Sequence, residues 1–145
     1  MRRQGGSTLL EVLVTMVIIA FGLLGVAGII ANGLKTDLSS YQRSQASWLA
    51  NDIIDRMRAN RHTAEDVAAP YNIAVGGGLD MSDVSNIPKL DLVTWRAALA
   101  AALPSGTGGV TVDAATRKVT VTIQWNDSRA AGGDTDQQFI VESRL

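Results

Sequence analysis

The chain contains no cysteine, only three prolines and a single histidine among its 145 residues. Without cysteine it can form neither disulfide bonds nor thiolate-ligated metal sites. This absence does not fix its compartment, because an exported domain can lack disulfides. The histidine, His62, cannot build a multi-histidine metal site, and we expect it to lie alone on the surface. Stability is therefore expected to come from packing.

Charge is also scarce. The formal net charge is −1, and nucleic-acid-binding proteins normally carry clustered Lys and Arg, so nucleic acid is not an expected partner. Residues 12–31 hold no charged side chain. Twenty such residues are about the length that a helix needs to cross a bilayer. Arg2 and Arg3 precede this run and should stay in the cytoplasm. The sequence predicts a single-pass anchor whose carboxy-terminal bulk lies across the membrane.

One carboxylate, Glu11, lies at the edge of the apolar run. An ionised carboxylate in hydrocarbon is costly, and a cation that pairs with it relieves much of the cost. The alternative interpretation is a side chain that reaches the aqueous interface, since Glu11 is near the helix end. The small pair Gly5 and Gly6 precedes the apolar run, whereas a secretory signal peptide has its small-residue cleavage site after it.

Residues 6–14, with the sequence GSTLLEVLV, resemble the class III signal of type IV pilins and pseudopilins. The resemblance implies that a prepilin peptidase cuts after Gly6 on the cytoplasmic side and methylates the new amino terminus at Ser7. It also implies that Glu11 is the family's signature acid. This sequence departs from the family at Ser7, because the first mature residue is commonly Phe.

Cleavage after Gly6 would leave a free α-amino group on Ser7, which is positively charged at neutral pH. Within one chain Ser7 and Glu11 are four residues apart and would share one helix face. Between chains, Glu11 of one subunit could meet the amine of another. Such a contact would fix the axial register of the two subunits as well as neutralise the carboxylate.

The helix is predicted to continue past the membrane as far as about residue 60, roughly 80 Å in all at 1.5 Å per residue. No proline interrupts the chain before Pro70. Three glycines, Gly22, Gly25 and Gly28, recur at intervals of three residues. They could form a face where helices pack or allow the helix to bend. The alternative is that they have no special role, because transmembrane helices tolerate glycine. Beyond Gly33 the three-and-four spacing predicts a stripe buried against a soluble head. Its members are Leu34, Leu38, Tyr41, Gln45, Trp48, Leu49, Ile53 and Met57.

The remaining residues predict a small α+β head. Asp91 is the expected N-cap of an amphipathic helix that Pro104 and Gly106 end, with Trp95 in the core. Alternation of apolar and polar residues predicts a half-buried strand in the carboxy-terminal third. The expected strands are residues 110–113, 119–125 and 138–142. A long helix packed on this antiparallel sheet is similar to the lollipop arrangement of pilins.

No catalytic motif is evident, so we expect neither an enzyme nor a bound cofactor. Two acidic groups are interpreted as surface loops rather than calcium sites, because neither has EF-hand spacing. They are Asp80, Asp83 and Asp91, and Asp127, Asp134 and Asp136. A basic cluster is interpreted as a solvated helix end. Its members are Arg56, Arg58, Arg61 and His62.

The resemblance implies a minor pilin of a bacterial type IV pilus, and looser matches at residues 49–60, 95–106 and 123–125 are similar to PilV-like proteins. The expected divisions are a leader (1–6), a transmembrane and assembly helix (7–31), an amphipathic continuation (32–60) and a head (61–145). Implied partners are other pilin and minor pilin subunits, prepilin peptidase, the inner-membrane assembly machinery and the bilayer. Expected locations are the inner membrane, with a cytoplasmic amino terminus and a periplasmic head, and then the extracellular fibre. The alternatives are a type II secretion pseudopilin, a pilus-tip module for adhesion or DNA uptake, and a signal-anchored periplasmic enzyme.

Overall fold

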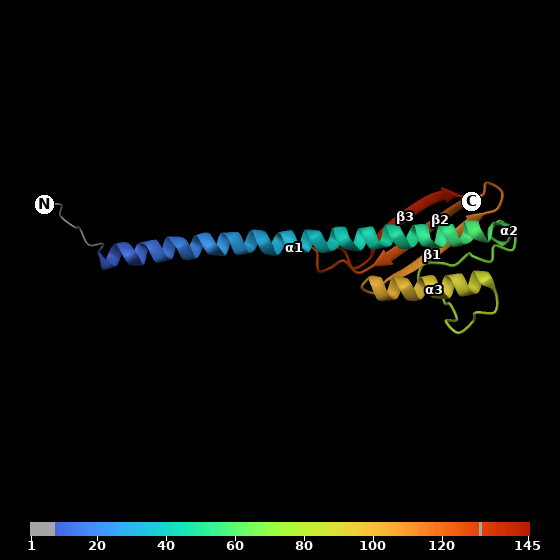
Figure 1. Cartoon of the computed structure of the whole chain (residues 1–145), viewed down its shortest axis with the longest axis horizontal. Helices are drawn as coiled ribbons and strands as arrows, with labels where there is room; N and C mark the ends of the chain where they lie inside the picture. Colours follow the sequence, from blue (N-terminus) through green and yellow to red (C-terminus); the bar gives the residue numbers. More distant parts are fainter. Residues whose placement is uncertain (1–7, 131) are drawn as a thin grey trace.

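A computed structural model describes residues 8–130 and 132–145 of the chain. One long helix extends far beyond a small head made of two further helices and a sheet (Figure 1). The elements in chain order are α1 (Leu9–Ala59), α2 (Arg61–Ala64), α3 (Ile87–Ala102), β1 (Thr107–Asp113), β2 (Lys118–Trp125) and β3 (Gln137–Arg144). This α+β lollipop is the predicted fold class.

Helix α1 contains 51 residues and continues through its glycines without interruption. At 1.5 Å per residue it is roughly 77 Å long. An added Cβ at Gly22, Gly25 or Gly28 would meet nothing within 4 Å beyond the helix's own backbone, so the space beside these glycines is open in the described parts of the chain. Every residue from Leu9 to Leu38 is exposed. About the first half of α1 therefore has no packing partner of its own.

The head is a three-stranded antiparallel sheet in the order β1-β2-β3. Alternation along β2 buries four side chains, as predicted: Val119, Val121, Ile123 and Trp125. Strand β1 begins at Thr107, three residues before the predicted start. Sequence reasoning missed this extension because it contains Gly108 and Gly109, and glycine has low strand propensity.

Gly108 has a packing reason to be glycine. A Cβ added there would lie 2.4 Å from Cη2 of Trp95 and 2.8 Å from Cδ1 of Leu99, both on α3. Real Cβ atoms do not approach that closely, so only glycine lets α3 lie this near the sheet.

The predicted start of α3 was wrong. The helix begins at Ile87, and its N-cap is Asn86, whose side chain accepts a hydrogen bond from the Lys89 N–H at 3.0 Å. Pro88 in the first turn suits this start, because proline's fixed φ fits a helix there and its missing N–H leaves no donor unsatisfied. Asp91 instead lies one turn further on, where it is buried.

The predicted stripe on α1 was also wrong in part. The head covers Ile53 and Met57, as predicted, but the rest of the buried face is formed by Gln42, Ala46, Ala50 and Ile54, which the stripe did not include. Leu34, Tyr41 and Trp48 are 65%, 59% and 70% exposed. The small alanines at the contact let the sheet approach α1 closely, whereas the large side chains on the neighbouring face remain in solvent.

Two buried tryptophans connect the head to α1. The Trp95 indole N–H donates to the Leu49 carbonyl at 2.8 Å, and the Trp125 indole N–H donates to Oε1 of Gln42 at 3.1 Å. Trp95 is fully buried, which confirms its predicted place in the core. Because a buried indole N–H needs an acceptor, these two bonds fix how the head sits along the helix.

Candidate assembly site at the start of the long helix

The first turn of α1 is capped by Thr8. Its backbone is extended, and its Oγ1 accepts a hydrogen bond from the Glu11 N–H at 3.4 Å. The spacing Thr8-x-x-Glu11 is that of a capping box, in which the acid's side chain can also reach back to the N-cap N–H. Glu11 is the acidic residue of this first turn, where a negative charge is favoured by the helix dipole.

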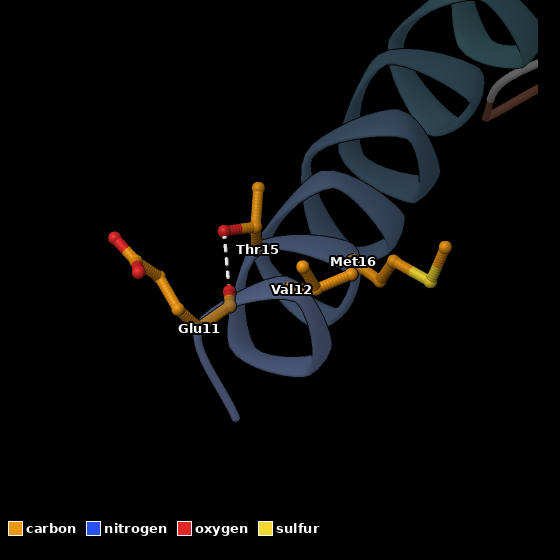
Figure 2. Close-up of a pocket in the computed structure, with 4 residues that line it drawn as sticks. All are labelled: Glu11, Val12, Thr15 and Met16. Carbon is orange, nitrogen blue, oxygen red and sulfur yellow. Dashed lines mark hydrogen bonds between the residues drawn. The ribbon is translucent and has the colours of Figure 1, made fainter. Parts of the chain in front are cut away.

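The Glu11 side chain points away from the helix axis (Figure 2). It borders an open surface hollow of about 290 Å³ together with Val12, Thr15 and Met16. The Thr15 hydroxyl donates to the Glu11 backbone carbonyl at 2.7 Å rather than to its carboxylate. Within residues 8–130 and 132–145 the Glu11 carboxylate has no hydrogen bond and no ion pair. It can therefore accept a partner from elsewhere.

Gly6 and Ser7 lie outside the described residues. Cleavage after Gly6, methylation of Ser7 and the pairing of its amine with Glu11 therefore remain predictions. The described helix begins at Leu9, and Thr8 is its N-cap.

Elsewhere in the described chain, no group of three or more His, Asp or Glu side chains could hold a metal ion. Asp80 accepts hydrogen bonds from the Ser82 hydroxyl and N–H, and these bonds lower the pKa of its carboxyl. Asp83 pairs with Lys89 and accepts from the Ser85 N–H, which together lower its pKa to about 2. Both carboxylates thus have local partners.

The basic cluster at the end of α1 is held by ion pairs. Arg56 pairs with Asp52, four residues earlier on α1, at 3.0 Å, and Arg58 pairs with Asp55 at 2.9 Å. Arg61 on α2 pairs with Glu65 at 2.6 Å, and this bond is the main cause of the lowered pKa of Glu65. His62 is exposed, as expected.

Sequence reasoning missed a buried polar chain that links α3 to α1. The Tyr71 hydroxyl donates to Oδ2 of Asp91 at 2.7 Å and accepts from the Asn60 side chain at 3.2 Å. Asp91 also faces Arg56, with 3.5 Å between Oδ1 and the guanidinium. Burial and the bond to Asp91 raise the pKa of Tyr71 to about 12. Asp91 was assigned as an N-cap, so its part in this buried polar network was not predicted.

The interpretation of Asp127, in the connection between β2 and β3, as part of an acidic surface loop was wrong. Asp127 is 2% exposed, and its Oδ2 accepts a hydrogen bond from the Ser39 hydroxyl of α1 at 2.8 Å. Ser39 is the first residue of α1 that is partly buried rather than exposed. This bond therefore marks the point along the helix where the head begins.

The family model of the prokaryotic N-terminal methylation motif matches residues 1–27. This segment of the chain is pilin-like. The motif and the long helix with its small sheet together support a type IV pilin-like family, in which processing by prepilin peptidase and assembly with pilin partners are general features. Comparisons with curated proteins and with solved structures give no match.

The same segment supports membrane anchoring of this pilin-like chain. Among the described residues, α1 is the one helix long and apolar enough to cross a membrane, judged by length and composition. None of its apolar window is buried against the head. Bilayer or neighbouring helices are the environments that would cover such a surface.

Proposed function

We propose that this chain is a minor pilin of a bacterial type IV pilus, assembled or primed through an ion pair between Glu11 and a processed amine on Ser7. The observation that carries the proposal is the position of Glu11. It lies in the first turn of a helix that is wholly exposed over its membrane-length segment. Its carboxylate has no partner within the described residues.

The charge balance favours a neighbouring subunit as the source of that partner. A carboxylate that enters hydrocarbon needs a cation to relieve its desolvation cost. Cleavage after Gly6 would create one such cation on every chain, so an array of chains could neutralise every Glu11 in turn. The methylation motif at residues 1–27 supports this processing.

Charge and hydropathy also predict the orientation of the chain in the membrane and its transfer to the fibre. Arg2 and Arg3 would hold the leader in the cytoplasm, and the head would fold in the periplasm. The apolar half of α1 would leave the inner membrane for the fibre core when the subunit is incorporated. In this role the chain is a structural subunit and a substrate of prepilin peptidase, and it has no enzymatic activity of its own.

Glu11→Ala is expected to leave membrane insertion intact and to reduce incorporation into fibres by at least roughly tenfold, because an unpaired amine would remain. Insertion is measured by membrane fractionation, and incorporation by the amount of the chain in sheared fibres. Thr15→Ala is the matched control, one turn away and also exposed, and should incorporate normally. Mass spectrometry of the mature amino terminus tests cleavage and methylation. Normal incorporation of Glu11→Ala would contradict the role given to the carboxylate.

A type II secretion pseudopilin is the nearest alternative, since it would use the same amino-terminal physics. Strains that lack one assembly machinery or the other separate the two cases. The chain should lose its fibre location only when the pilus machinery is absent. Loss only in the secretion mutant would favour the pseudopilin.

A tip-binding module is favoured by one feature of the head. A groove of about 580 Å³ lies between the segment that follows α2 and the end of β1, with Glu65, Val67, Val112 and Asp113 among its lining residues. Val67 is 90% exposed. Adhesion of fibres that carry Val67→Asp would test this candidate. A role in DNA uptake would instead require salt-dependent DNA binding by the chain.

A further inference from the structure

The two edges of the sheet differ in how their backbone groups are protected. Outside β1, Ile73 and Val110 exchange both of their backbone hydrogen bonds, each at 2.9 Å. Two residues further along β1, the Val112 N–H donates to Oδ1 of Asn72 at 2.7 Å. Strand β3 forms the opposite edge, on the side of the head away from α3 (Figure 1). Among the described elements, none pairs with this outer edge of β3.

The register shows which backbone groups β3 presents at this edge. Because Val110 bonds outward to Ile73, its partner Val121 on β2 directs its own N–H and C=O toward β3. Alternation along β3 then turns the backbone groups of every second residue away from β2. These residues, all exposed, are Gln138, Ile140, Glu142 and Arg144. Within residues 8–130 and 132–145, none of these outward N–H groups has an acceptor.

The side chains of β3 do little to protect the edge. Natural proteins usually blunt an open edge with charge, proline or a bulge. Residues 137–141, with the sequence QQFIV, contain neither charge nor proline, and β3 pairs with β2 residue for residue without a bulge. Ile140 is 57% exposed on the face of the sheet away from the core, and Phe139 and Val141 are only partly buried on the other face. Such an edge can accept an added strand.

The direction of β3 argues against a second copy of the chain as that strand. β3 runs in the same sense as α1, since Ser39 bonds to Asp127 ahead of β3 and the later Arg58 bonds to Ser143 near its end. Antiparallel pairing of two β3 strands would therefore point the two α1 helices in opposite directions. This step rests on the proposed function, in which all copies are anchored in one membrane in the same sense. An antiparallel second copy does not meet that condition.

We infer that the outer edge of β3 is a docking site for an extended segment of a different protein, which adds to the sheet as an antiparallel fourth strand. Hydrogen bonds to the outward backbone groups hold the segment, and its side chains give specificity. Beside Ile140 it carries a β-branched residue, which makes a favourable cross-strand pair. Beside Arg144, which forms no ion pair within the described residues, it carries a carboxylate.

A synthetic peptide tests this site on the full-length chain in detergent. The fluorescent probe has the sequence GEVTVTIQG, which copies β2 from Val119 to Gln124 and carries glutamate in place of Lys118. In the register of β2, its glutamate lies beside Arg144 and one threonine lies beside Ile140. The matched control peptide has both threonine amides N-methylated, because these N–H groups would face β3. Fluorescence anisotropy should show saturable binding of the probe below roughly 1 mM and none of the control.

Variants of the chain locate the binding site. Ile140→Pro removes one outward N–H and keeps the ladder to β2, since proline is tolerated where the N–H of an edge strand faces solvent. Ile140→Lys adds a charge to the same edge without changing the backbone. Each should weaken binding of the probe by at least roughly tenfold. Thr111→Lys, also exposed but on β1, is the matched control and should bind the probe as the unaltered chain does.

Charge exchange tests the register. Arg144→Glu should weaken binding of the glutamate probe and should strengthen binding of a probe with lysine at that position. Equal responses of the two probes would contradict the register. Equal binding of the N-methylated peptide, no saturable binding of the probe, or an equal loss in Thr111→Lys overturns the inference. A dimer of the full-length chain that Ile140→Lys dissociates also overturns it, because a second copy would then occupy the edge.

The closing measurement separates this inference from the proposed function. Cleavage after Gly6 and incorporation into sheared fibres are followed for the unaltered chain. If both are normal and the probe does not bind, the inference fails and the proposed function stands. If the leader is retained and the chain never reaches fibres, the proposed function fails.

Discussion

Single polar side chains fix the head on α1. Asp91 is 9% exposed and lies between Tyr71 and Arg56, and Asp127 is 2% exposed and accepts a bond from Ser39. Removing one partner from such a group would leave a buried charge without compensation, which typically costs more than the bond itself contributed. These residues therefore hold the angle between head and helix, on which any regular array of subunits depends.

Tyr71 predicts a dependence of stability on alkaline pH. Its pKa is raised from 10.0 to about 12, so between these values the folded chain keeps a proton that the unfolded chain releases. The stabilisation is complete below pH 10 and is lost as the pH rises through 12. The free energy of unfolding, measured by denaturant titration, should fall across this range. Tyr71→Phe should remove the part of this decrease in the free energy of unfolding that Tyr71 causes. Tyr41→Phe, at an exposed position, should leave the decrease unchanged. An unchanged slope in Tyr71→Phe would contradict the assignment.

At the scale of elements, the sequence predicted what depends on local pattern. The alternation in β2, the length of α1 and the burial of Trp95 each follow from a periodicity within one segment. The face of α1 that contacts the head could not be predicted from periodicity, because both candidate faces have helical spacing. The structure buries the face with Ala46 and Ala50 and leaves Trp48 in solvent, since small side chains allow the sheet to approach. This choice depends on the shape of the sheet, which lies elsewhere in the chain.

The start of α3 and the residues of the candidate site show the same division. Asn86 followed by Pro88 is a recognisable N-cap signal. Asp91 can also cap a helix and lies nearer to the amphipathic segment, so the sequence favoured it. Glu11 was found because its residue type conflicts with its apolar surroundings. Asp127 was not, because a single acid in a polar loop gives no such conflict, and its burial depends on Ser39, 88 residues away.

The contact between α3 and β1 predicts a large effect from a small substitution. Gly108→Ala would place a methyl group 2.4 Å from the Trp95 ring. We expect a loss of about 1–3 kcal/mol in the free energy of unfolding, as for other overpacked cores. Chemical denaturation of the purified chain measures it. Gly78→Ala is the control, because a Cβ there meets nothing within 4 Å, and it should change stability little. Equal effects of the two substitutions would show that α3 can move away from the sheet.

At the scale of the whole molecule, the segment of α1 that packs on the head and the apolar segment that suits a membrane occupy separate parts of the helix. Leu9 to Leu38 are exposed, and Ser39 donates a hydrogen bond to Asp127 in the connection between β2 and β3. Every member of the buried core lies at Ala46 or beyond. The apolar half of α1 therefore contributes little to the stability of the head, and its surface is available to the membrane or to other subunits.

This separation predicts that a chain lacking residues 1–31 folds as a soluble head with its arm. Its thermal unfolding midpoint should lie within about 3 °C of that of the full chain in detergent, since none of the core contacts is removed. Circular dichroism at 222 nm measures the helix, and tryptophan fluorescence reports Trp95 and Trp125 in the core. Removing residues 1–45 is the matched comparison. It deletes Ser39 and Gln42, leaves Asp127 and the Trp125 N–H without partners, and should lower the midpoint clearly. A large loss on removal of residues 1–31 alone would mean that the membrane half of α1 supports the head, and that anchor and fold are not independent.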